Sequence, residues 1–393
     1  MTNIRVFTII IIVLLGLSLP GSSMARPGSI SSDIMAANSS WQITEFLSEN
    51  DQGRYSSLDL DPDGDPHISF LDYTTDEIKY VHRQGDDWEG MTVDTLTAPT
   101  DPNTSLALNG SDQPHIAYPF VNPCSLGYAN WDGAQWQLEK LGGTCTEYVQ
   151  IALDGAGEPC VSYYIWTSSD AGIVVRCHNE TGWQAGLGRI PVHYSFVQEK
   201  ALYHSLLVEN DGTPHLSFYR QLLSNPAQLW YAWHDGDTWW GTAVDEGPDV
   251  GSYSSLELDE DGYPCISYYD HGNGDLKYVH WNGSEWDIET IDSSGDIGVY
   301  TSLELDGSGN PHISYYDATN ANLKYAYWDG SQWLMETVDS EGEVGEWTSL
   351  ALDDAGNAHI SYYDRTNGNL KYATNSSAQS NNVYLPLALN LYP

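Results

Sequence analysis

Residues 300–339 read YTSLELDGSGNPHISYYDATNANLKYAYWDGSQWLMETVD, and variants of this segment recur along most of the chain. The leucine of its S-L strand has a counterpart in every copy, at Leu58, Leu106, Ile151, Leu206, Leu256, Leu303 and Leu350. Neighbouring members of this series are 45 to 55 residues apart. A period of this length indicates a repeat architecture in which each copy forms one structural unit, so we count seven units.

Each unit contains the sequence signals of four short strands. In residues 300–339 the alternating stretch SLELD stops at the turn DGSGNP, and PHISYY, LKYAYW and a last strand after WDGSQW follow. Glycine in the turn supplies a positive φ, and proline at the start of the second strand costs no ladder hydrogen bond. The sequence therefore predicts an all-β fold, a seven-bladed β-propeller with four antiparallel strands per blade.

A tryptophan column predicts how the ring closes. Its members are Trp41, Trp88, Trp136, Trp183, Trp239, Trp286 and Trp333. Trp41 precedes the first S-L strand, and no tryptophan follows the seventh S-L strand, whose anchor is Leu350. We therefore expect residues 41–47 to supply the fourth strand of the last blade, which would leave no free edge between first and last blades. A solenoid with capping repeats is the alternative, but it would not need a permuted strand.

The turns between the third and fourth strands carry a family resemblance. WDGAQW at 131–136, WNGSEW at 281–286 and WDGSQW at 328–333 resemble a shortened Asp-box turn of the BNR, or sialidase-like, propellers. The resemblance rests on the Gly-to-Trp spacing. It implies a propeller across residues 41–374 and implies little about sialidase activity.

Both ends of the chain lie outside the repeats. Arg5, an apolar run over 6–19 and small residues ending at Ala25 are typical of a secretory signal peptide, here residues 1–25, followed by a lead over 26–40. A polar linker over 375–382 precedes an apolar tail over 383–393, which is too short to cross a bilayer as a helix. We expect a secreted or surface-associated monomer with no transmembrane helix in the mature chain.

The composition excludes some partners. Fifty-five acidic residues against 14 Lys and Arg give a net charge of −41, which argues against nucleic acid because phosphate binding needs clustered cations. The charge also counts against anionic substrates. With 27 Tyr and 15 Trp the chain is too aromatic for a disordered acidic tail.

The mouth of the central channel is the predicted ligand site, because propeller ligands favour this concave place. Six units carry an aromatic residue three positions before the apolar anchor, and four end their second strand with an aspartate. The predicted ligand-binding residues are Tyr55, Asp72, Tyr203, Arg220, Tyr253, Asp270, Tyr300, Asp317, Trp347 and Asp364. The alternative for the aspartates is that each caps its own turn. An insertion over 183–203 adds polar residues beside Arg220.

Metal and cysteine chemistry give further expectations. Asp59, Asp61 and Asp63 form a D-x-D-x-D-G run that resembles a calcium loop, although a hairpin turn with solvated acids is the alternative. No other cofactor is expected. Cys160 should face Cys177 across a hairpin and form a disulfide. A second, separate expectation is that Cys124 and Cys145 pair on the loops of blades two and three. Cys265 is expected to be a buried thiol, with intermolecular pairing as the alternative.

Three function classes remain. The preferred one is a non-catalytic module that binds a glycan by stacking sugars on Tyr and Trp and accepting hydroxyl hydrogens at Asp. The others are a cell-surface protein-interaction scaffold and a polysaccharide-active enzyme, either a lyase or a sialidase-like glycosidase. A lyase site could draw on Arg189, His193, Tyr203, His204 and Arg220. Near-regular blades favour a binding module, since catalysis would require several blades to be specialised.

Overall fold

The computed structural model describes residues 41–376, apart from 49, 86, 97–102, 122–123, 143–145, 167–170, 185, 188, 192–199 and 222–225, together with residues 385–386. The chain divides into two units, Met1–Ser39 and Ser40–Pro393. The expected signal peptide and lead, and most of the expected linker and tail, fall outside the described residues. Within the described part, no helix could span a membrane.

The described strands form seven sheets, of which the first four follow the chain in simple order. Blade 1 comprises β2 (Gln52–Leu60), β3 (Pro66–Asp72), β4 (Glu77–Gln84) and β5 (Asp87–Thr95). Blade 2 comprises β6 (Ser105–Leu108), β7 (Pro114–Val121), β8 (Cys124–Trp131) and β9 (Trp136–Lys140). Blade 3 comprises β10 (Thr146–Leu153), β11 (Pro159–Trp166), β12 (Ala171–Asn179) and β13 (Gly182–Trp183), and β14 (Arg189–Pro191) also pairs with β12. Blade 4 comprises β15 (Lys200–Val208), β16 (Pro214–Gln221), β17 (Gln228–His234) and β18 (Trp239–Asp245).

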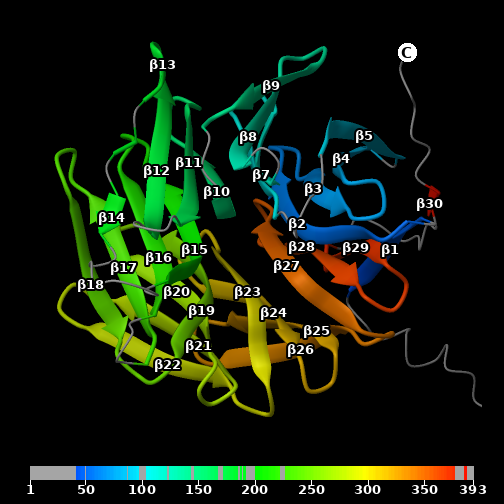
Figure 1. The fold of residues 1–393 in the computed structure, drawn as a ribbon. Helices are drawn as coiled ribbons and strands as arrows, with labels where there is room; N and C mark the ends of the chain where they lie inside the picture. The colour runs from blue at the N-terminus through cyan, green and yellow to red at the C-terminus, as the bar shows by residue number, and fades with distance from the viewer. Residues whose placement is uncertain are drawn as a thin grey trace, which may run out of the picture. The chain divides into compact units, whose positions relative to one another are not determined.

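The remaining three blades complete the ring in Figure 1, in which the sheets follow one another from blade 1 in blue to blade 7 in orange. Blade 5 comprises β19 (Val250–Leu258), β20 (Pro264–Asp270), β21 (Asp275–Trp281) and β22 (Trp286–Asp292). Blade 6 comprises β23 (Ile297–Leu305), β24 (Pro311–Asp317), β25 (Asn322–Trp328) and β26 (Trp333–Asp339). Blade 7 comprises β27 (Val344–Leu352), β28 (Ala358–Asp364), β29 (Asn369–Thr374) and β1 (Gln42–Leu47), with β30 (Leu385–Pro386) beside β1. The predicted seven-bladed propeller is confirmed.

The N-terminal strand closes the last blade as predicted. β1 pairs antiparallel with β29, and Phe46 lies opposite Leu370. Trp41 packs edge-on against Tyr325 of the preceding blade at 5.2 Å between ring centroids, and its indole N–H donates to Glu336 at 2.9 Å. Because β1 fills the position that the fourth strand has in other blades, the first and last segments of the propeller hold each other in place.

Serines join the innermost strands of neighbouring blades. The Oγ of Ser57 in blade 1 accepts a hydrogen bond from the backbone N–H of Leu106 in blade 2, and Ser349 of blade 7 does the same for Leu58 of blade 1, each at 3.0 Å. The other described pairs are Ser105 with Ile151, Ser205 with Leu256, Ser255 with Leu303 and Ser302 with Leu350. An innermost strand exposes N–H groups that have no strand partner, and these serines satisfy one of them in each case.

The core lies between the faces of adjacent blades. One apolar residue in the second strand of every blade is fully buried; the column is Ile68, Ile116, Val161, Leu216, Ile266, Ile313 and Ile360. Six of the seven tryptophans in the column pack edge-on against a tyrosine of the blade before, as Trp333 does against Tyr278 at 5.5 Å; Trp239 is the exception. Five blades carry a buried histidine near the start of the second strand, namely His67, His115, His215, His312 and His359. The Nδ1 of His115 hydrogen-bonds to the hydroxyl of Tyr128 at 2.7 Å, and burial lowers the pKa of His115 to about 4.

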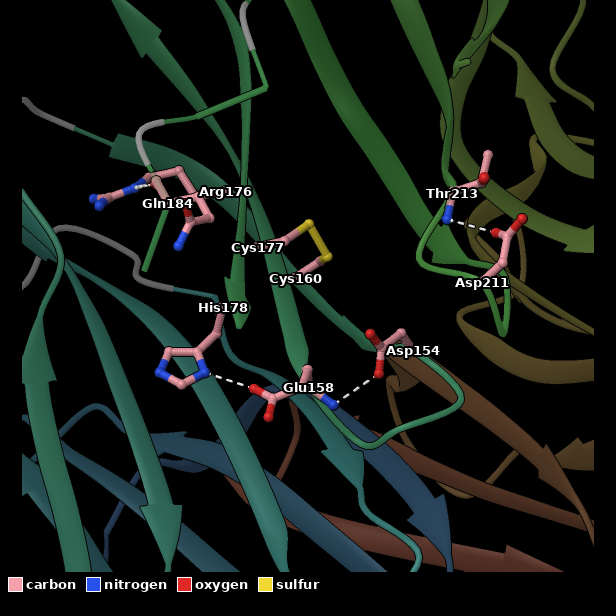
Figure 2. Close-up of a disulfide and its surroundings, with 9 residues drawn as sticks. All are labelled: Asp154, Glu158, Cys160, Arg176, Cys177, His178, Gln184, Asp211 and Thr213. Carbon is pink, nitrogen blue, oxygen red and sulfur yellow. Dashed lines mark hydrogen bonds and ion pairs between the residues drawn. A yellow bond between two sulfur atoms is a disulfide. The ribbon is translucent and has the colours of Figure 1, made fainter. Parts of the chain in front are cut away.

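A disulfide joins two strands of blade 3. Cys160 on β11 lies opposite Cys177 on β12, and the two are bonded, with their Cα atoms 4.0 Å apart (Figure 2). This is the pairing that the hairpin register predicts. Cys145 and the side chain of Cys124 lie outside the described residues, so their pairing stays a prediction. Cys265 is a buried free thiol, and burial raises its pKa to about 11.

Candidate functional site

Six aromatic residues near the start of the innermost strands form the candidate site. These residues, which we call the aromatic collar, are Tyr55, Tyr148, Tyr203, Tyr253, Tyr300 and Trp347. All six have positive φ angles, between 51° and 58°, and all are half-buried. The pairing register with the second strand shifts beside each of them, so each sits in a β-bulge. A bulky residue in this conformation is strained by about 1–3 kcal/mol, and such strain concentrates at binding sites.

The collar rings contact one another from blade to blade. Ring centroids are 5.1 Å apart between Tyr148 and Tyr203 and 4.3 Å apart between Tyr203 and Tyr253. The arc continues from Tyr253 to Tyr300 at 4.7 Å, to Trp347 at 5.6 Å and to Tyr55 at 4.5 Å. Side chains from six blades can form such a chain only if they converge around the propeller axis. The collar is therefore one continuous aromatic surface.

Blade 2 supplies the single break in this arc. Asn103 occupies the collar position there, and its side chain holds the backbone of the next blade: Nδ2 donates to the carbonyl of Val149 at 2.6 Å, and Oδ1 accepts from its N–H at 3.0 Å. The amide thus bridges blades 2 and 3 at the place where an aromatic ring would otherwise contact Tyr55 and Tyr148.

Tyrosine hydroxyls inside the collar are linked to one another. Tyr253 shares hydrogen bonds with both Tyr203 and Tyr300. Burial raises the pKa of Tyr300 to about 12 and that of Tyr253 further above its ordinary value. The phenols are therefore neutral at physiological pH, and they can donate to or accept from a polar ligand lying on the collar.

A second tier of tyrosines surrounds the collar in blades 4 to 7, and the sequence analysis missed it. Its members are Tyr219, Tyr269, Tyr316 and Tyr363, whose ring centroids lie 5.3 to 6.5 Å from the collar ring of the same blade. The Tyr219 hydroxyl donates to Asp249 at 2.6 Å and the Tyr363 hydroxyl to Asp51 at 2.7 Å. The repeat could have revealed these tyrosines, because the second tyrosine of PHISYY directly precedes the aspartate that ends the second strand, as Tyr316 precedes Asp317.

The four predicted aspartates follow the turn-capping alternative and not the ligand-binding one. Asp72, Asp270, Asp317 and Asp364 are 0 to 3% exposed. In blade 6, Asp317 accepts hydrogen bonds from the backbone N–H and the side-chain amide of Asn320, both at 2.9 Å. Asp270 and Asp364 make the same contacts in their turns, and Asp72 accepts from Thr74, Thr75 and Asn50. Both oxygens of each carboxylate are engaged, so these residues shape the rim and do not present free acceptors.

The described arginines serve separate contacts. The guanidinium of Arg220 stacks on Trp230, with 4.2 Å from Cζ to the ring centroid. Arg54 forms a bidentate pair with Asp51, and Arg365 binds Glu346 at 3.0 Å. His204 is buried behind the collar, with its Nε2 2.9 Å from Ser162 Oγ, and burial lowers its pKa to about 4. His193 and the side chain of Arg189 lie outside the described residues.

The predicted calcium loop does not converge on a common point. Asp61 accepts from the backbone N–H groups of Asp63 and Asp65 and so stabilises its own turn. Asp59 points away from that turn and accepts from the N–H of Leu108 in the next blade at 2.8 Å. The structure describes all three aspartates and forms no metal-binding group of His, Cys, Asp or Glu among its described residues.

Three carboxylates on the innermost strands lie beneath the collar. These residues, which we call the axis carboxylates, are Asp59, Glu257 and Glu304, each four positions after a collar residue on β2, β19 and β23. The pKa of Glu304 is raised well above its ordinary value, chiefly by burial and to a smaller extent by the negative charges of Glu257 and Asp59. Asp59 stands two blades away from Glu304, so their interaction places both beside the propeller axis. Burial also raises the pKa of Glu257 to about 8 and that of Asp59 to about 6, although hydrogen bonds from Leu108 and Leu60 oppose the shift at Asp59.

The comparisons with known proteins agree with the fold. No protein-family model and no curated protein matches this chain. An ulvan lyase, a polysaccharide lyase, has a TM-score of 0.61 at 11% identity, over 84% of this chain and 93% of its own. A protein of unknown function from Dyadobacter fermentans has a TM-score of 0.53 at 12% identity, over 85% and 98%, and AofleA from Arthrobotrys oligospora has 0.51 at 14%, over 77% and 90%. The chain is thus a seven-bladed β-propeller that resembles these proteins in architecture.

Proposed function

We propose that this protein is a secreted, non-catalytic β-propeller that binds glycans at its aromatic collar. The observation that carries the proposal is the collar itself, a continuous arc of six half-buried rings from six blades in strained backbone positions. Sugar rings present C–H faces that stack on Tyr and Trp, while the collar phenols can hydrogen-bond to sugar hydroxyls. A packing role alone would not require strained aromatic residues around the axis in almost every blade.

Two further observations support this function. One of the structures similar in fold is an ulvan lyase bound to -[GlcA(1-4)Rha3S]-, so this architecture accommodates a saccharide in at least one protein of similar fold (TM-score 0.59, 12% identity). The Cys160–Cys177 disulfide fits an oxidising compartment, in keeping with the signal peptide that the sequence predicts.

The enzyme alternative has less support from the site. A lyase needs a His or Tyr base beside a free arginine that neutralises a uronate. The arginines near the rim of blades 7 and 1 are already paired with Asp51 and Glu346, and His204 is buried against Ser162. A protein-interaction scaffold remains the second candidate, because a continuous aromatic surface also suits a protein partner.

A glycan array separates these functions. We expect the purified protein to give a saturable signal on a limited group of glycans and Trp347→Ala to reduce it at least tenfold. Trp240→Ala is the matched control, since Trp240 is 53% exposed on the outermost strand β18 and lies far from the collar in the blade. A blank array would reject glycan binding and favour the scaffold, and equal loss in both variants would remove the collar from the site.

A further inference from the structure

Four acids stand at one repeated position at the outer end of the innermost strands. Each directly precedes such a strand and stands four residues before the collar residue of the same blade. These residues, which we call the rim acids, are Asp51, Asp249, Asp296 and Glu343. A ligand that reaches the collar from this end of the strands therefore passes them.

A basic side chain of the same blade contacts three of the rim acids. The pairs are Asp51 with Arg54 at 2.6 Å, Asp249 with His271 at 2.8 Å and Glu343 with Arg365 at 3.8 Å. His271 and Arg365 each follow the aspartate that ends the second strand, and blade 6 carries Ala318 at that position. The fourth rim acid, Asp296, is exposed, and none of the ion pairs among the described residues includes it.

A buried tyrosine links Asp296 to the collar. The Tyr269 hydroxyl donates to Oδ1 of Asp296 at 2.5 Å, and the Tyr269 ring lies 6.5 Å from the Tyr253 ring, centroid to centroid. Thr319 Oγ1 accepts a hydrogen bond from the backbone N–H of Asp296 at 2.7 Å. No described residue donates a hydrogen bond to the second carboxylate oxygen, Oδ2. The carboxylate is thus oriented by its neighbours and still presents an acceptor oxygen to the solvent.

From this arrangement we propose that Asp296 forms the outer part of the glycan site, and that the ligand is a neutral oligosaccharide of at least two sugar residues. The inference rests on the proposed function and names the ligand class and a specificity-determining residue of the same site. One sugar residue lies on the rings of Tyr253 and Tyr300, and a residue nearer the rim donates hydroxyl hydrogens to Asp296. Hydrogen bonds to an ionised carboxylate are stronger than those to a neutral acceptor.

The length and the charge of the ligand follow from the geometry. Asp296 and Tyr300 are four residues apart along one chain segment, roughly 13 Å if fully extended and less across the bulge. Tyr269 contacts Asp296 with its hydroxyl and Tyr253 with its ring, so it adds to this separation. One sugar ring is therefore expected not to reach both ends of the site. A uronate or sulfate would be repelled by Asp296, which has no cation beside it.

Binding to sugars of increasing length tests this inference. The probes are the neutral mono- to tetrasaccharides of a glycan array that includes glucose, mannose, galactose, xylose and fucose series, with tetragalacturonate as the anionic probe. In the neutral series that binds, we expect the tetrasaccharide to bind at least tenfold more tightly than the monosaccharide, and tetragalacturonate not to bind. In Asp296→Ala this gain with length should fall below threefold.

Two further variants separate the acceptor role from a structural one. Asp249→Ala is the matched control, because it also removes a hydrogen bond from a second-tier tyrosine, but the Asp249 carboxylate is already paired with His271, so the gain with length should remain. Ala318→Arg supplies the basic side chain that Arg365 supplies in blade 7, and it should reduce the gain as Asp296→Ala does. Ala318 and Asp296 are both exposed, so the variants at these positions should fold.

The outcomes distinguish the inference from the proposed function. Equal affinity for the monosaccharide and the tetrasaccharide, or a gain with length that survives Asp296→Ala, would overturn the inference and leave glycan binding intact. The same loss in Asp249→Ala, or a signal on charged glycans only, would overturn it as well. If the array is blank for the unmodified protein, both the inference and the proposed function fail.

Discussion

Blades 5 to 7 and blades 2 to 4 differ in the polar contacts that their second and third strands make. In blades 5 to 7 a lysine of the third strand and a tyrosine of the second strand both bind the aspartate that ends the preceding blade. The three sets are Lys277, Tyr268 and Asp245; Lys324, Tyr315 and Asp292; and Lys371, Tyr362 and Asp339. In blade 2, Tyr118 binds Asp94 in this way, but Gly127 stands where the lysine would be.

The other two irregular blades also lack the lysine. Trp230 takes its place in blade 4 and is covered by Arg220. In blade 3, the guanidinium of Arg176 donates to the carbonyl of Leu141 in blade 2 at 2.6 Å, and the Cys160–Cys177 disulfide ties two strands together (Figure 2). The comparison teaches that the repeated ion pair is one means of fixing a blade joint, and that single hydrogen bonds, from Tyr118 in blade 2 and from Arg176 in blade 3, cross the joint where the lysine is absent. The Arg220–Trp230 stack and the disulfide instead hold strands together within blades 4 and 3.

The largest effect should follow from breaking one of the ion pairs. Burial alone would raise the pKa of Asp292, but hydrogen bonds from Lys324 and Tyr315 lower it below its ordinary value. Asp292→Ala leaves a mostly buried ammonium group without its partner, which should cost about 3–4 kcal/mol in the free energy of unfolding. Asp94→Ala removes hydrogen bonds from the Tyr118 hydroxyl and the Thr95 backbone N–H but breaks no ion pair, and it should cost about 1–2 kcal/mol. Equal losses in denaturant unfolding would contradict the comparison.

The next effect concerns the bulge that positions the collar. Gly298 has a φ of 104°, and a Cβ at this position would lie 2.7 Å from the Cα of Leu276. Gly298→Ala should therefore cost about 2–3 kcal/mol and disturb Tyr300, two residues later. The same position in blade 4 is Ala201, so Ala201→Gly should change stability by less than about 1 kcal/mol. Thermal unfolding of both variants tests this prediction. Unchanged stability in Gly298→Ala would show that the contact between Gly298 and Leu276 is less tight than the structure indicates.

The sequence predicted the architecture well because the repeat carries redundant information. Seven copies of one alternating pattern determine the strands, and the displaced first tryptophan, Trp41, was enough to predict the closure by β1. The same logic located the collar, since an aromatic residue at one fixed position in six units has to face one place. What the period could not show was the positive φ at these residues, because aromatic side chains seldom adopt it.

The roles of the acidic residues were harder to predict for a physical reason. Whether Asp317 faces a ligand or its own turn depends on the rotation of one side chain, and the repeat period is the same in both cases. The axis carboxylates, by contrast, could have been found. Glu257 and Glu304 occupy a position that is alanine or leucine in four other blades, and an acid in such a column marks either a pair or a site.

A third prediction concerns the pH dependence of stability and depends on Glu257 of blade 5. The folded-state pKa of Glu257 is raised by burial to about 8, so the native state binds more protons than the unfolded state between the ordinary glutamate value and that pKa. Stability should therefore fall as pH rises through this window. Glu257→Gln should raise the free energy of unfolding at pH 8 by about 1–2 kcal/mol and flatten the decline. Glu260→Gln, in an exposed turn of the same blade, should leave the decline unchanged in chemical unfolding measured from pH 5 to 8.

The smallest expected effect comes from the aspartates that end the second strand, Asp72, Asp270, Asp317 and Asp364. Blades 2 to 4 carry other residues at this position. Blades 2 to 4 form the corresponding loops with Phe120, Ile165 and Arg220, so a carboxylate is not required to end the second strand. Asp317→Ala removes two hydrogen bonds within one turn and should cost only about 1 kcal/mol. Glycan binding should then remain within about twofold of the original protein, since the carboxylate lies under the rim and both of its oxygens are engaged. A tenfold loss of glycan affinity with unchanged stability would show that Asp317 contacts the ligand. A loss of stability as large as that of Asp292→Ala would show that this turn contributes as much to the free energy of unfolding as the ion pair between blades does.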